Sequence, residues 1–545
     1  MESFAAEHDR EQCAGGKLLG WPLLVIAVSA FAVVVPFFWL GTPSGHDFEF
    51  HVHSWMEVRS QWHQGIVYPR WAALAYYGYG EARFIFYPPA SWMLGAILSL
   101  VLPWGIVPAA YIWVCLTLSG CSMFLLARRW LTQRDAIFAA ALFAVNPYYI
   151  VIVYWRSAFA ELLAGALVPL VLICLLEIEE SKRAWIWLAC VVAAGELTNA
   201  PAALMINFSV ALLAVVMACQ RRSWKIIGWA ALAGLVGTTL AGFYVFPAWY
   251  EQRWVNIGQV LSVGVRPQDN FLFTKIADAD HNRFNLLISI VACAEIAAVE
   301  LAALVAFKRR TQNRACWMAV IWAGLSTLLM FSVASALWSH VPLLEFVQLP
   351  WRWLLCVDVA LALLVTMAWG RWRWRAVVLM GFLVILAVVW HRVQPPWWDK
   401  KADILEMLDQ QQSRAGYEGT DEYVPIAADP YEIKPTGPRL ELSDGNTKGF
   451  EIQKWAAEQK EFSVNVPLPG QVTVRLFNYP AWEVRVNGQT AGPETKEGSG
   501  EMLIPVSAGM NHVDIRLGPT WDRKLGGIVS LISLVGLVGL IGILR

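Results

Sequence analysis

Long apolar segments alternate with polar connections along most of the chain. A helix crosses a bilayer in about 20 apolar residues, so each segment of that length predicts a membrane span. Twelve segments qualify: residues 18–40, 107–127, 134–150, 157–177, 184–199, 202–219, 226–247, 284–307, 315–338, 353–370, 375–392 and 525–544. This pattern predicts a polytopic α-helical membrane protein with about twelve transmembrane helices.

Residues 89–102 form a shorter apolar segment, equivalent to about four helical turns. Lys and Arg in short loops mark the cytoplasmic side of a membrane protein. If residues 89–102 crossed the membrane, Arg128, Arg129 and Arg134 would lie outside, so we predict a re-entrant or interfacial helix. The basic clusters then place both termini in the cytoplasm of a bacterial cell, with Lys182-Arg183, Lys308 to Arg310 and Arg545 on the inner side.

The polar stretch 393–523 differs sharply from the rest of the chain and predicts one extracytoplasmic domain. Residues 400–415 have a helical pattern. Short alternating runs follow at even spacing, separated by Pro-Gly, Asn-Gly and Ala-Gly turns, and this favours a C-terminal β-sandwich. The runs are 462–466, 472–477, 482–486, 502–506 and 512–517. The predicted domains are therefore residues 1–392, with a first outer loop at 41–106, residues 393–523, and the anchor 524–545.

Composition agrees with a membrane protein, because 57% of the residues are hydrophobic and only 15% are charged. The net charge is zero, which gives no sign of a nucleic-acid partner. None of the nine cysteines falls in 393–523, and no CxxC pair occurs. The cysteines therefore predict neither a disulfide framework nor a cysteine metal site.

Acids and histidines cluster where the first apolar segment returns to water, at Asp47, Glu49, His46, His51 and His53. A carboxylate at the membrane boundary can act as a general base on an acceptor hydroxyl, or hold a divalent cation against a phosphate. The alternative is a solvated acidic loop. The histidine spacing is not diagnostic of a metal site, so the cofactor stays open, with a divalent metal ion as one option.

Arg156 and Glu161 lie near the start of the fourth predicted span. Charged side chains are costly inside hydrocarbon, so these two must face a cavity, a partner or water. One interpretation is an arginine that holds an anionic phosphate, with Glu161 supporting it or Asp47. The other is an ion pair that fixes helix packing.

Other outer-face residues are weaker candidates for substrate binding. Arg70, Arg83 and Tyr87 lie in a basic, aromatic stretch that suits a lipid phosphate or a headgroup anchor. Asn199 lies in a turn between two apolar segments, where a turn role is the default. The remaining two, Gln348 and Arg352, stand beside two tryptophans and a proline that also suit an interfacial anchor.

Short motifs across the chain carry a resemblance to known families. The acid after the first span, the Tyr-Pro-Pro helix of the first outer loop and the Arg and acid of the second resemble the GT-C superfamily of membrane glycosyltransferases. More narrowly, the chain is similar to bacterial membrane proteins labelled 6-pyruvoyl-tetrahydropterin-synthase-related, a label that implies no pterin chemistry here. The motifs are Gly45 to Phe48, Tyr68 to Trp71, Phe86 to Pro89, Asn146 to Tyr148, Arg156 to Glu161 and Gln348 to Trp353.

The polar domain resembles YfhO-like members of the same superfamily, through Phe477 to Trp482 and Val486 to Gln489. The resemblance implies a GT-C-like fold and transfer of a sugar from a polyprenyl-phosphate-linked donor to an envelope acceptor on the outer face, with inversion. It implies Asp47 as the base. Glu161 stands where the superfamily usually has an aspartate, so it is the second catalytic candidate. Membrane lipid is the other implied partner, and the acceptor is not identified.

Two other classes of function remain open from the sequence. A transporter or flippase of lipid-linked glycans would use ionisable residues inside spans, such as Glu196, Glu295, Glu300 and Asp358. A non-catalytic scaffold would bind glycans through the polar domain. Geometry separates these readings, because a transferase needs Asp47 beside Arg156 and Glu161, whereas a transporter needs the span acids along one path.

Overall fold

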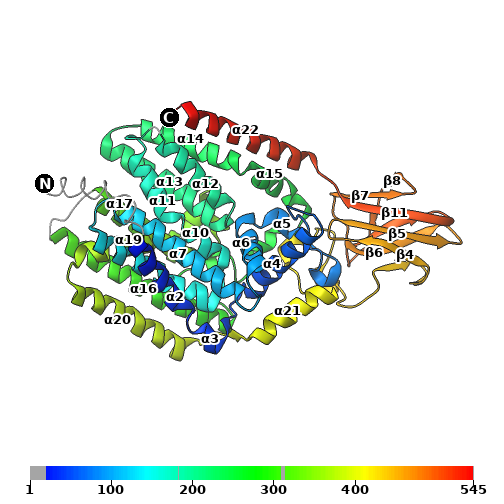
Figure 1. Ribbon diagram of the computed structural model, residues 1–545, viewed down its shortest axis with the longest axis horizontal. Helices are drawn as coiled ribbons and strands as arrows, with labels where there is room; N and C mark the ends of the chain where they lie inside the picture. The colour runs from blue at the N-terminus through cyan, green and yellow to red at the C-terminus, as the bar shows by residue number, and fades with distance from the viewer. Residues whose placement is uncertain (1–19, 182, 309–313, 544–545) are drawn as a thin grey trace.

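The computed structural model describes residues 20–181, 183–308 and 314–543. A bundle of apolar helices carries two antiparallel β-sheets that project from one end (Figure 1). The predicted polytopic helical membrane protein is confirmed. Both chain termini lie outside the described residues. So do four residues of the basic clusters, namely Lys182, Arg309, Arg310 and Arg545.

Nine helical segments within the described ranges are long and apolar enough to cross a membrane. They are Gly20–Leu40 (α2 and α3), Val107–Ala127 (α7), Gln133–Arg156 (α8, α9 and η2), Phe159–Glu177 (α10 and α11), Ala200–Arg221 (α13), Ala279–Lys308 (α16), Pro350–Ala368 (η8 and α19), Trp372–Val393 (α20 and η9) and Trp521–Ile543 (α22). Two bent pairs raise the number to as many as eleven. Their bends are 77° between Lys225–Leu240 (α14) and Gly242–Trp254 (α15 and η3), and 85° between Cys316–Leu329 (α17) and Ser332–His340 (η6 and α18).

The expected number of about twelve was therefore too high for the described residues. The difference lies at α12 (Ala184–Glu196), a helix of 13 residues that covers about 20 Å, less than the hydrocarbon core of about 30 Å. Hydropathy extends this segment to residue 199, but the Asn199 side chain accepts a hydrogen bond from the Ala202 amide at 3.0 Å and caps α13. The short apolar helix predicted at 89–102 is present as α6 (Pro89–Val101), while its re-entrant placement stays a prediction.

The spans differ strongly in how much of each the rest of the protein covers. In the span that contains α19, the rest of the protein buries 94% of the most apolar 18-residue stretch. The corresponding share is 11% in the spans that contain α20 and α22. A helix that is apolar on all sides and covered by protein belongs in the core of the bundle, whereas an uncovered apolar helix faces lipid. α19 is therefore the central helix, and α20 and α22 lie on the outer surface of the bundle.

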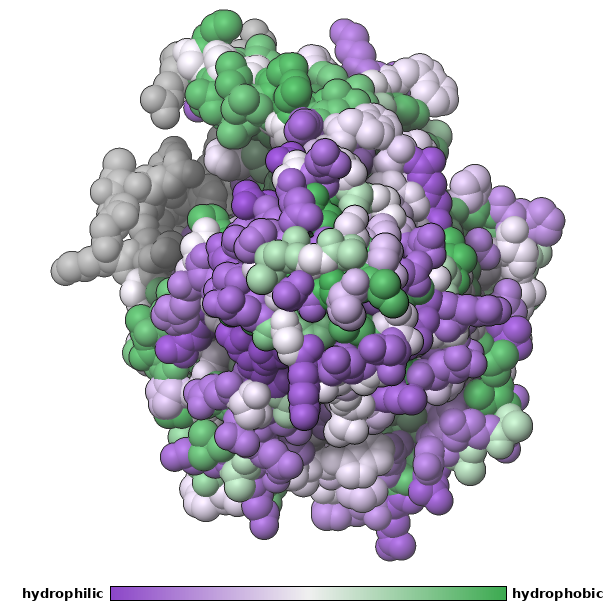
Figure 2. Space-filling view, turned by 90° about the vertical axis from the view of Figure 1, so that its right-hand side faces the viewer, coloured by the Kyte–Doolittle hydropathy of each residue, from purple (hydrophilic) through white to green (hydrophobic). Residues whose placement is uncertain are grey.

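Residues 41–106 build a layer between the bundle and the sheets. This layer contains α4 (Phe48–His63), α5 (Arg83–Phe86) and α6, and α21 (Lys401–Ser413) joins them at the same end (Figure 1). Figure 2 shows that this end of the molecule is largely hydrophilic, with apolar residues gathered towards its rim. The start of α2 and the end of α22 lie at the opposite end of the bundle (Figure 1).

The two sheets share one apolar core. The first has the strand order β3-β6-β10-β9 and the second β4-β5-β11-β7-β8, all antiparallel. Every second residue of each main strand points inward, as Phe462 and Val464 do on β5. The strands are β3 (Leu440–Leu442), β4 (Phe450–Trp455), β5 (Gln459–Val466), β6 (Gly470–Phe477), β7 (Trp482–Val486), β8 (Gln489–Ala491), β9 (Glu494–Thr495), β10 (Glu501–Val506) and β11 (Gly509–Leu517).

The β7–β8 hairpin is closed by a two-residue turn. Asn487 and Gly488 have φ values of +50° and +81°. A two-residue turn of this hand requires residues that tolerate positive φ, and Asn-Gly is the favoured pair. The Asn-Gly turn predicted from the sequence therefore forms this hairpin.

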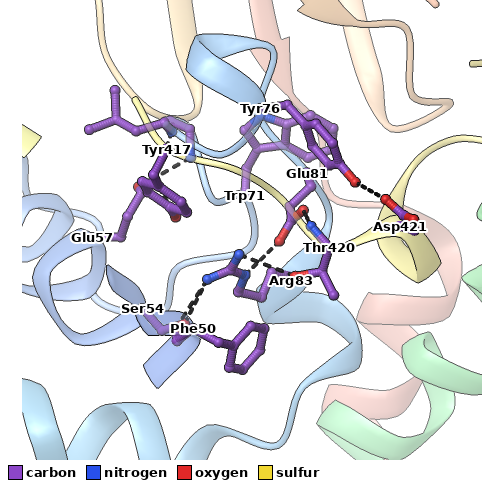
Figure 3. A network of polar contacts seen from close by, with 12 residues as sticks. Phe50, Ser54, Glu57, Trp71, Tyr76, Glu81, Arg83, Tyr417, Thr420 and Asp421 are labelled. Carbon is purple, nitrogen blue, oxygen red and sulfur yellow. Dashed lines mark hydrogen bonds and ion pairs between the residues drawn. The ribbon is translucent and has the colours of Figure 1, made fainter. Parts of the chain in front are cut away.

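A buried polar network joins the first outer loop to the chain that leads into the sheets (Figure 3). Arg83 donates to Glu81 at 2.5 Å and to the Ser54 hydroxyl at 3.0 Å. The second Glu81 oxygen accepts the Thr420 amide at 2.7 Å, and Tyr417 donates to Glu57 at 3.1 Å. Arg83 was expected at the membrane surface, but it is 1% exposed. It fixes the sheets to the bundle instead, since a buried cation needs such partners.

Candidate functional site

The segment from Gly45 to Asp47 is fixed against the end of the third span. The Asp47 amide donates to the Arg156 carbonyl at 2.9 Å, and the Gly45 amide donates to Ser157 Oγ at 3.0 Å. A β-carbon on Gly45 would lie 2.5 Å from the Arg156 carbonyl carbon, which no real side chain tolerates. This contact requires glycine at position 45. It brings the Asp47 carboxylate beside Arg156.

The backbone around Arg156 departs from a regular α-helix. Residues Ile152–Arg156 form a π-helical turn, η2, and Ser157 follows with a φ of +52°. A π-turn adds one residue to a helix and re-aims the side chains around it, and such turns are frequent at functional sites. A left-handed serine is held there only by its surroundings, here by its hydrogen bonds to Gly45 and to the Pro43 carbonyl.

Two arginines share one buried carboxylate next to Asp47. Glu161 Oε2 accepts Arg156 Nη1 at 2.5 Å and Arg352 Nε at 3.1 Å, and the Tyr148 hydroxyl donates to Glu161 Oε1. Glu161 is 1% exposed. The second acid at Arg156 is Asp47, whose Oδ2 lies 4.0 Å from Arg156 Nη2 and whose side chain is 31% exposed. Glu161 is thus occupied and enclosed, and Asp47 is the accessible carboxylate of the cluster.

Neighbouring groups hold both arginines in place. Arg352 Nη1 donates to Gln348 Oε1 at 2.9 Å, and Gln348 Nε2 donates to the Val260 carbonyl at 2.7 Å. The Arg156 guanidinium lies over the Trp351 ring, 4.6 Å from its centroid. A guanidinium over an indole face is stabilised by the ring, while the N–H groups at its edge can still donate hydrogen bonds. The motif from Gln348 to Trp353 therefore acts here as a support for two cations.

His46 controls the charge of Asp47. The His46 Nδ1 atom lies 2.7 Å from Asp47 Oδ1, and the His46 side chain is 87% exposed. Burial alone would raise the pKa of the Asp47 carboxyl, but the His46 hydrogen bond and the charges of His46, Arg156 and His51 outweigh it and hold that pKa well below its usual range. The same hydrogen bond raises the pKa of His46. Asp47 is therefore ionised at neutral pH.

Tyr87 and His51 form the aromatic side of this cluster. The Tyr87 ring centroid lies 5.8 Å from that of His51 and 4.8 Å from that of Phe50. Burial, followed by the charge of Asp47, raises the pKa of the Tyr87 hydroxyl, which stays protonated. Burial lowers the pKa of His51 to about 4, so its imidazole is neutral at pH 7. Both groups can donate or accept hydrogen bonds without adding charge.

Four sequence candidates lie away from this cluster. Glu49 is exposed on α4. The Arg70 guanidinium lies 4.7 Å from the Tyr68 ring centroid, and the Arg70 amide donates to Glu458 of the sheet region at 2.9 Å. Asn199 serves as the cap of α13, and the His53 ring stacks on Tyr417 at 4.0 Å. Because α4 is a helix, His51 and His53 point to different sides of it.

His53 provides a test of a packing role. Burial lowers its pKa to about 3, so the ring is neutral, and its Nδ1 has no partner among the described residues. We expect His53→Phe to keep the stack and to raise the free energy of unfolding by about 1 kcal/mol, because an unsatisfied buried nitrogen is removed. His53→Ala should lower it by about 2 kcal/mol. Denaturant unfolding of the purified protein measures both, and equal damage from the two changes would contradict the packing role.

The donor set does not fit a divalent cation. Such an ion takes several carboxylate or other oxygen ligands. Glu161 already accepts from Arg156, Arg352 and Tyr148, which leaves Asp47 and His46. Across the described part of the chain, no three His, Cys, Asp or Glu side chains converge as a metal site would require. The arginines supply the positive charge in this cluster.

The acids inside the spans do not form a series. Glu295 and Asp358 are both fully buried, and Glu295 accepts the Tyr148 amide at 2.9 Å. Glu196 accepts from Asn207 at 2.8 Å in a separate contact between α12 and α13, and Glu300 is exposed on α16. The arrangement that would favour a transporter, with these acids along one path, is not observed among them.

The sequence indicated His46 only as a neighbour of the base and Trp351 only as part of an interfacial anchor. It gave Tyr148 no role beyond its place in the Asn146 to Tyr148 motif. Tyr148 lies in an apolar span directly after Asn146-Pro147. A tyrosine there is more often packed through its ring than used through its hydroxyl. The one sequence signal for a role of Tyr148 was its position directly after the Asn146-Pro147 helix start.

Two solved structures resemble this chain at low sequence identity. Both are crystal structures, each with a TM-score of 0.41: ArnT from Cupriavidus metallidurans bound to undecaprenyl phosphate, 15% identical over 68% of this chain and 64% of that one, and the apo oligosaccharyltransferase of Archaeoglobus fulgidus, 14% identical over 73% and 56%. The chain thus spans less than two thirds of either protein. No curated protein matches it.

The family model that matches is described as 6-pyruvoyl-tetrahydropterin synthase related domain; membrane protein, and it covers residues 84–394. This range includes Arg156, Glu161 and Arg352, and it begins after Asp47. It spans more than half of the 545 residues. The chain therefore belongs to the 6-pyruvoyl-tetrahydropterin synthase related family of membrane proteins.

Proposed function

We propose that this protein is a glycosyltransferase of the GT-C type that moves a sugar from a polyprenyl-phosphate-linked donor to an envelope acceptor. The observation that carries the proposal is the accessible, ionised carboxylate of Asp47 at 4.0 Å from Arg156, in a cluster with a second arginine, Arg352. A base and a cationic site for a leaving phosphate are what such a transfer needs side by side.

In the proposed reaction, Asp47 accepts the proton of the acceptor hydroxyl as its oxygen attacks the anomeric carbon. The new carbon–oxygen bond forms while the bond from that carbon to the phosphate oxygen breaks, and the electron pair stays on the departing phosphate. A single displacement of this kind inverts the anomeric carbon. Asp47 takes up one proton, and His46, at 2.7 Å, is the group that passes it on to solvent.

Arg156 and Arg352 stabilise the negative charge that develops on the leaving phosphate. Arginine suits this role because its planar donors match phosphate oxygens and stay protonated. Glu161 is a positioning residue in this scheme, since it holds both guanidinium groups and is itself enclosed. Tyr87 and Gln348 line the same cluster as neutral hydrogen-bonding groups.

The membrane arrangement follows from the same proposal. The donor's lipid tail stays in the bilayer and its phosphate reaches the membrane boundary, where α6 and the first outer loop meet the bundle. The protein would lie in the bacterial inner membrane with both termini in the cytoplasm and residues 393–523 outside. Support comes from the polar connections that meet at the sheet end, opposite the start of α2 and the end of α22 (Figure 1).

The test of this proposal is donor consumption by the purified full-length protein in lipid vesicles. Radiolabelled polyprenyl-phosphate sugars are added with an envelope extract as the acceptor source. We expect one donor to lose its sugar to a water-soluble or glycolipid product, with release of polyprenyl phosphate. Movement of intact donor across the bilayer without release would instead support a flippase, and no consumption over the donor panel would sink the transferase proposal.

His46 gives the proposal a pH signature. Removing it with His46→Ala takes away the hydrogen bond that keeps the pKa of Asp47 low, so that pKa rises. A general base acts only when deprotonated, and the acid limb of the rate profile should therefore move to higher pH. Initial transfer rates between pH 3 and pH 8 measure the shift, because the wild-type limb lies below this range and the limb of His46→Ala should enter it. The control is His63→Ala, an exposed histidine at the end of α4, and an unshifted limb in His46→Ala would argue against Asp47 as base.

A further inference from the structure

A polar cavity lies between the first outer loop and the sheets, apart from the Asp47 cluster. Its volume is about 350 Å³, in the lower range for ligand sites. Its walls come from the end of α4, the loop at Ala73–Gly78, the end of α21 and the turn between β4 and β5. Among the described residues, its lining includes no member of the Asp47 cluster.

Four cations and one acid line this cavity. The cations are Arg414, Arg439, Arg475 and Lys460, and the acid is Glu57. Burial lowers the pKa of Lys460 to about 7, so the three arginines carry the permanent charge. The Glu57 carboxylate already accepts the Leu74 amide at 2.7 Å and the Ala73 amide at 3.1 Å, and it also accepts from Tyr417 (Figure 3). The cavity therefore favours an anion.

Arg475 is built into the wall with one nitrogen unused. Its Nε donates to the Tyr77 carbonyl at 3.0 Å, and its Nη2 donates to the Lys434 and Pro435 carbonyls at 2.7 and 2.9 Å. The side chain is 7% exposed. Its Nη1 has no hydrogen-bond partner among the described residues and stands 2.7 Å from the position of a β-carbon at Gly437, a residue of the cavity lining. A buried guanidinium with a free donor at a cavity wall is a ready anion contact.

Trp455 contacts the other two arginines, Arg439 through its ring and Arg414 through its backbone carbonyl. The Arg439 guanidinium lies 5.6 Å from the Trp455 ring centroid, and Arg414 donates to the Trp455 carbonyl at 3.2 Å. Near them, both amide atoms of Gln411 are buried without a partner among the described residues. Sugar rings present apolar C–H faces together with hydroxyl groups. An aromatic face with amides and cations around it therefore matches an acidic sugar better than a purely apolar or purely anionic ligand.

The floor of the cavity is conformationally strained. Tyr76, Tyr77 and Gly78 have φ values of +49°, +55° and +98°. Consecutive left-handed residues that include two tyrosines persist only where the surroundings hold them, and such strain gathers at ligand sites. Two contacts that hold this turn are the Arg475 bond to the Tyr77 carbonyl and the Tyr76 bond to Asp421 at 2.8 Å (Figure 3).

We propose that this cavity binds a saccharide that carries a carboxylate. The arginines hold the carboxylate, Trp455 covers a sugar face, and Gln411 bonds hydroxyl groups. If the proposed transfer function holds, and only then, the bound saccharide is part of the acceptor. The binding itself does not depend on the Asp47 cluster, so the two proposals can fail separately.

The experiment measures binding of fluorescent trigalacturonate to the full-length protein in lipid nanodiscs, without any donor. We expect saturable binding that is at least tenfold weaker for neutral maltotriose. The double variant Arg414→Gln/Arg439→Gln should bind trigalacturonate at least tenfold more weakly. Both residues are exposed, so folding should persist, and the thermal unfolding midpoint checks this. Arg485→Gln, at an exposed arginine on β7, is the matched control and should bind as the wild type does.

Three results would overturn the inference. They are equal binding of the neutral and acidic saccharides, unchanged binding in the double variant, and an equal loss in Arg485→Gln, which would indicate general surface charge. Asp47→Asn separates this inference from the proposed function. It should bind trigalacturonate with an unchanged Kd whether or not transfer occurs, so lost transfer with retained binding leaves this site standing.

Discussion

Asp47→Asn should lower the rate of sugar transfer by at least about 100-fold, the effect expected when a general base is removed. The amide is the same size as the carboxylate and still accepts a hydrogen bond from His46, while the backbone bond from Asp47 to Arg156 is unaffected. The variant should therefore fold and insert normally. Transfer from the lipid-linked donor identified in the vesicle assay measures the loss.

Asp409→Asn is the matched control for this change. Asp409 is exposed on α21, and its side chain makes no hydrogen bond or ion pair within the described part of the chain. We expect wild-type transfer from it. Retention of more than a tenth of the wild-type rate in Asp47→Asn, with the donor still consumed, would assign the base to another residue.

Glu161→Gln should destabilise the protein by about 3 kcal/mol or more, because it leaves Arg352 buried without a counter-charge and leaves Arg156 with only Asp47, 4.0 Å away. The amide has the same shape as the carboxylate and still accepts a hydrogen bond from Tyr148. The lost stability therefore measures the effect of the Glu161 charge. Denaturant unfolding in detergent measures the change. Transfer should also fall, since both arginines lose the group that positions them.

The matched control for the stability effect is Glu177→Gln. Glu177 pairs with Arg129 at the end of α11, where the two side chains are 30% and 49% exposed. Ion pairs in water contribute less than about 1 kcal/mol. Equal destabilisation by the two changes would show that the Glu161 cluster is no more than an ordinary surface pair.

The two variants separate chemistry from positioning. Asp47→Asn should change the rate without changing the unfolding free energy, whereas Glu161→Gln should change both. This difference follows from exposure, because the Asp47 side chain is 31% exposed and the Glu161 side chain 1%. A group that is accessible can meet substrate, and a group that is enclosed acts through its neighbours.

Part of the candidate site was predictable. Hydropathy marked the spans, and the boundary between apolar and polar residues placed Asp47 and Arg156 near the same end of the bundle. The expectation that Arg156 and Glu161 must pair or face a cavity came from the cost of burying charge. Both residues do lie in one cluster with Asp47. The roles assigned to them stay predictions.

Other features could not be predicted from local pattern. Glu49 has the same chemistry as Asp47 and lies two residues away, yet it points into solvent because α4 has already begun. Arg352 follows Glu161 by 191 residues. The count of spans also depended on the structure, since the apolar segment 184–199 forms a helix only over Ala184–Glu196.

The sequence by itself determined the membrane class, the positions of most spans, the β-strands of the polar region and the need for partners at Arg156 and Glu161, because these follow from hydrophobic burial and charge cost over short windows. Only the tertiary structure decided which carboxylate is free. The π-turn at Ile152–Arg156 re-aims Arg156, and the contact of Gly45 with Ser157, 112 residues away along the chain, brings Asp47 beside it.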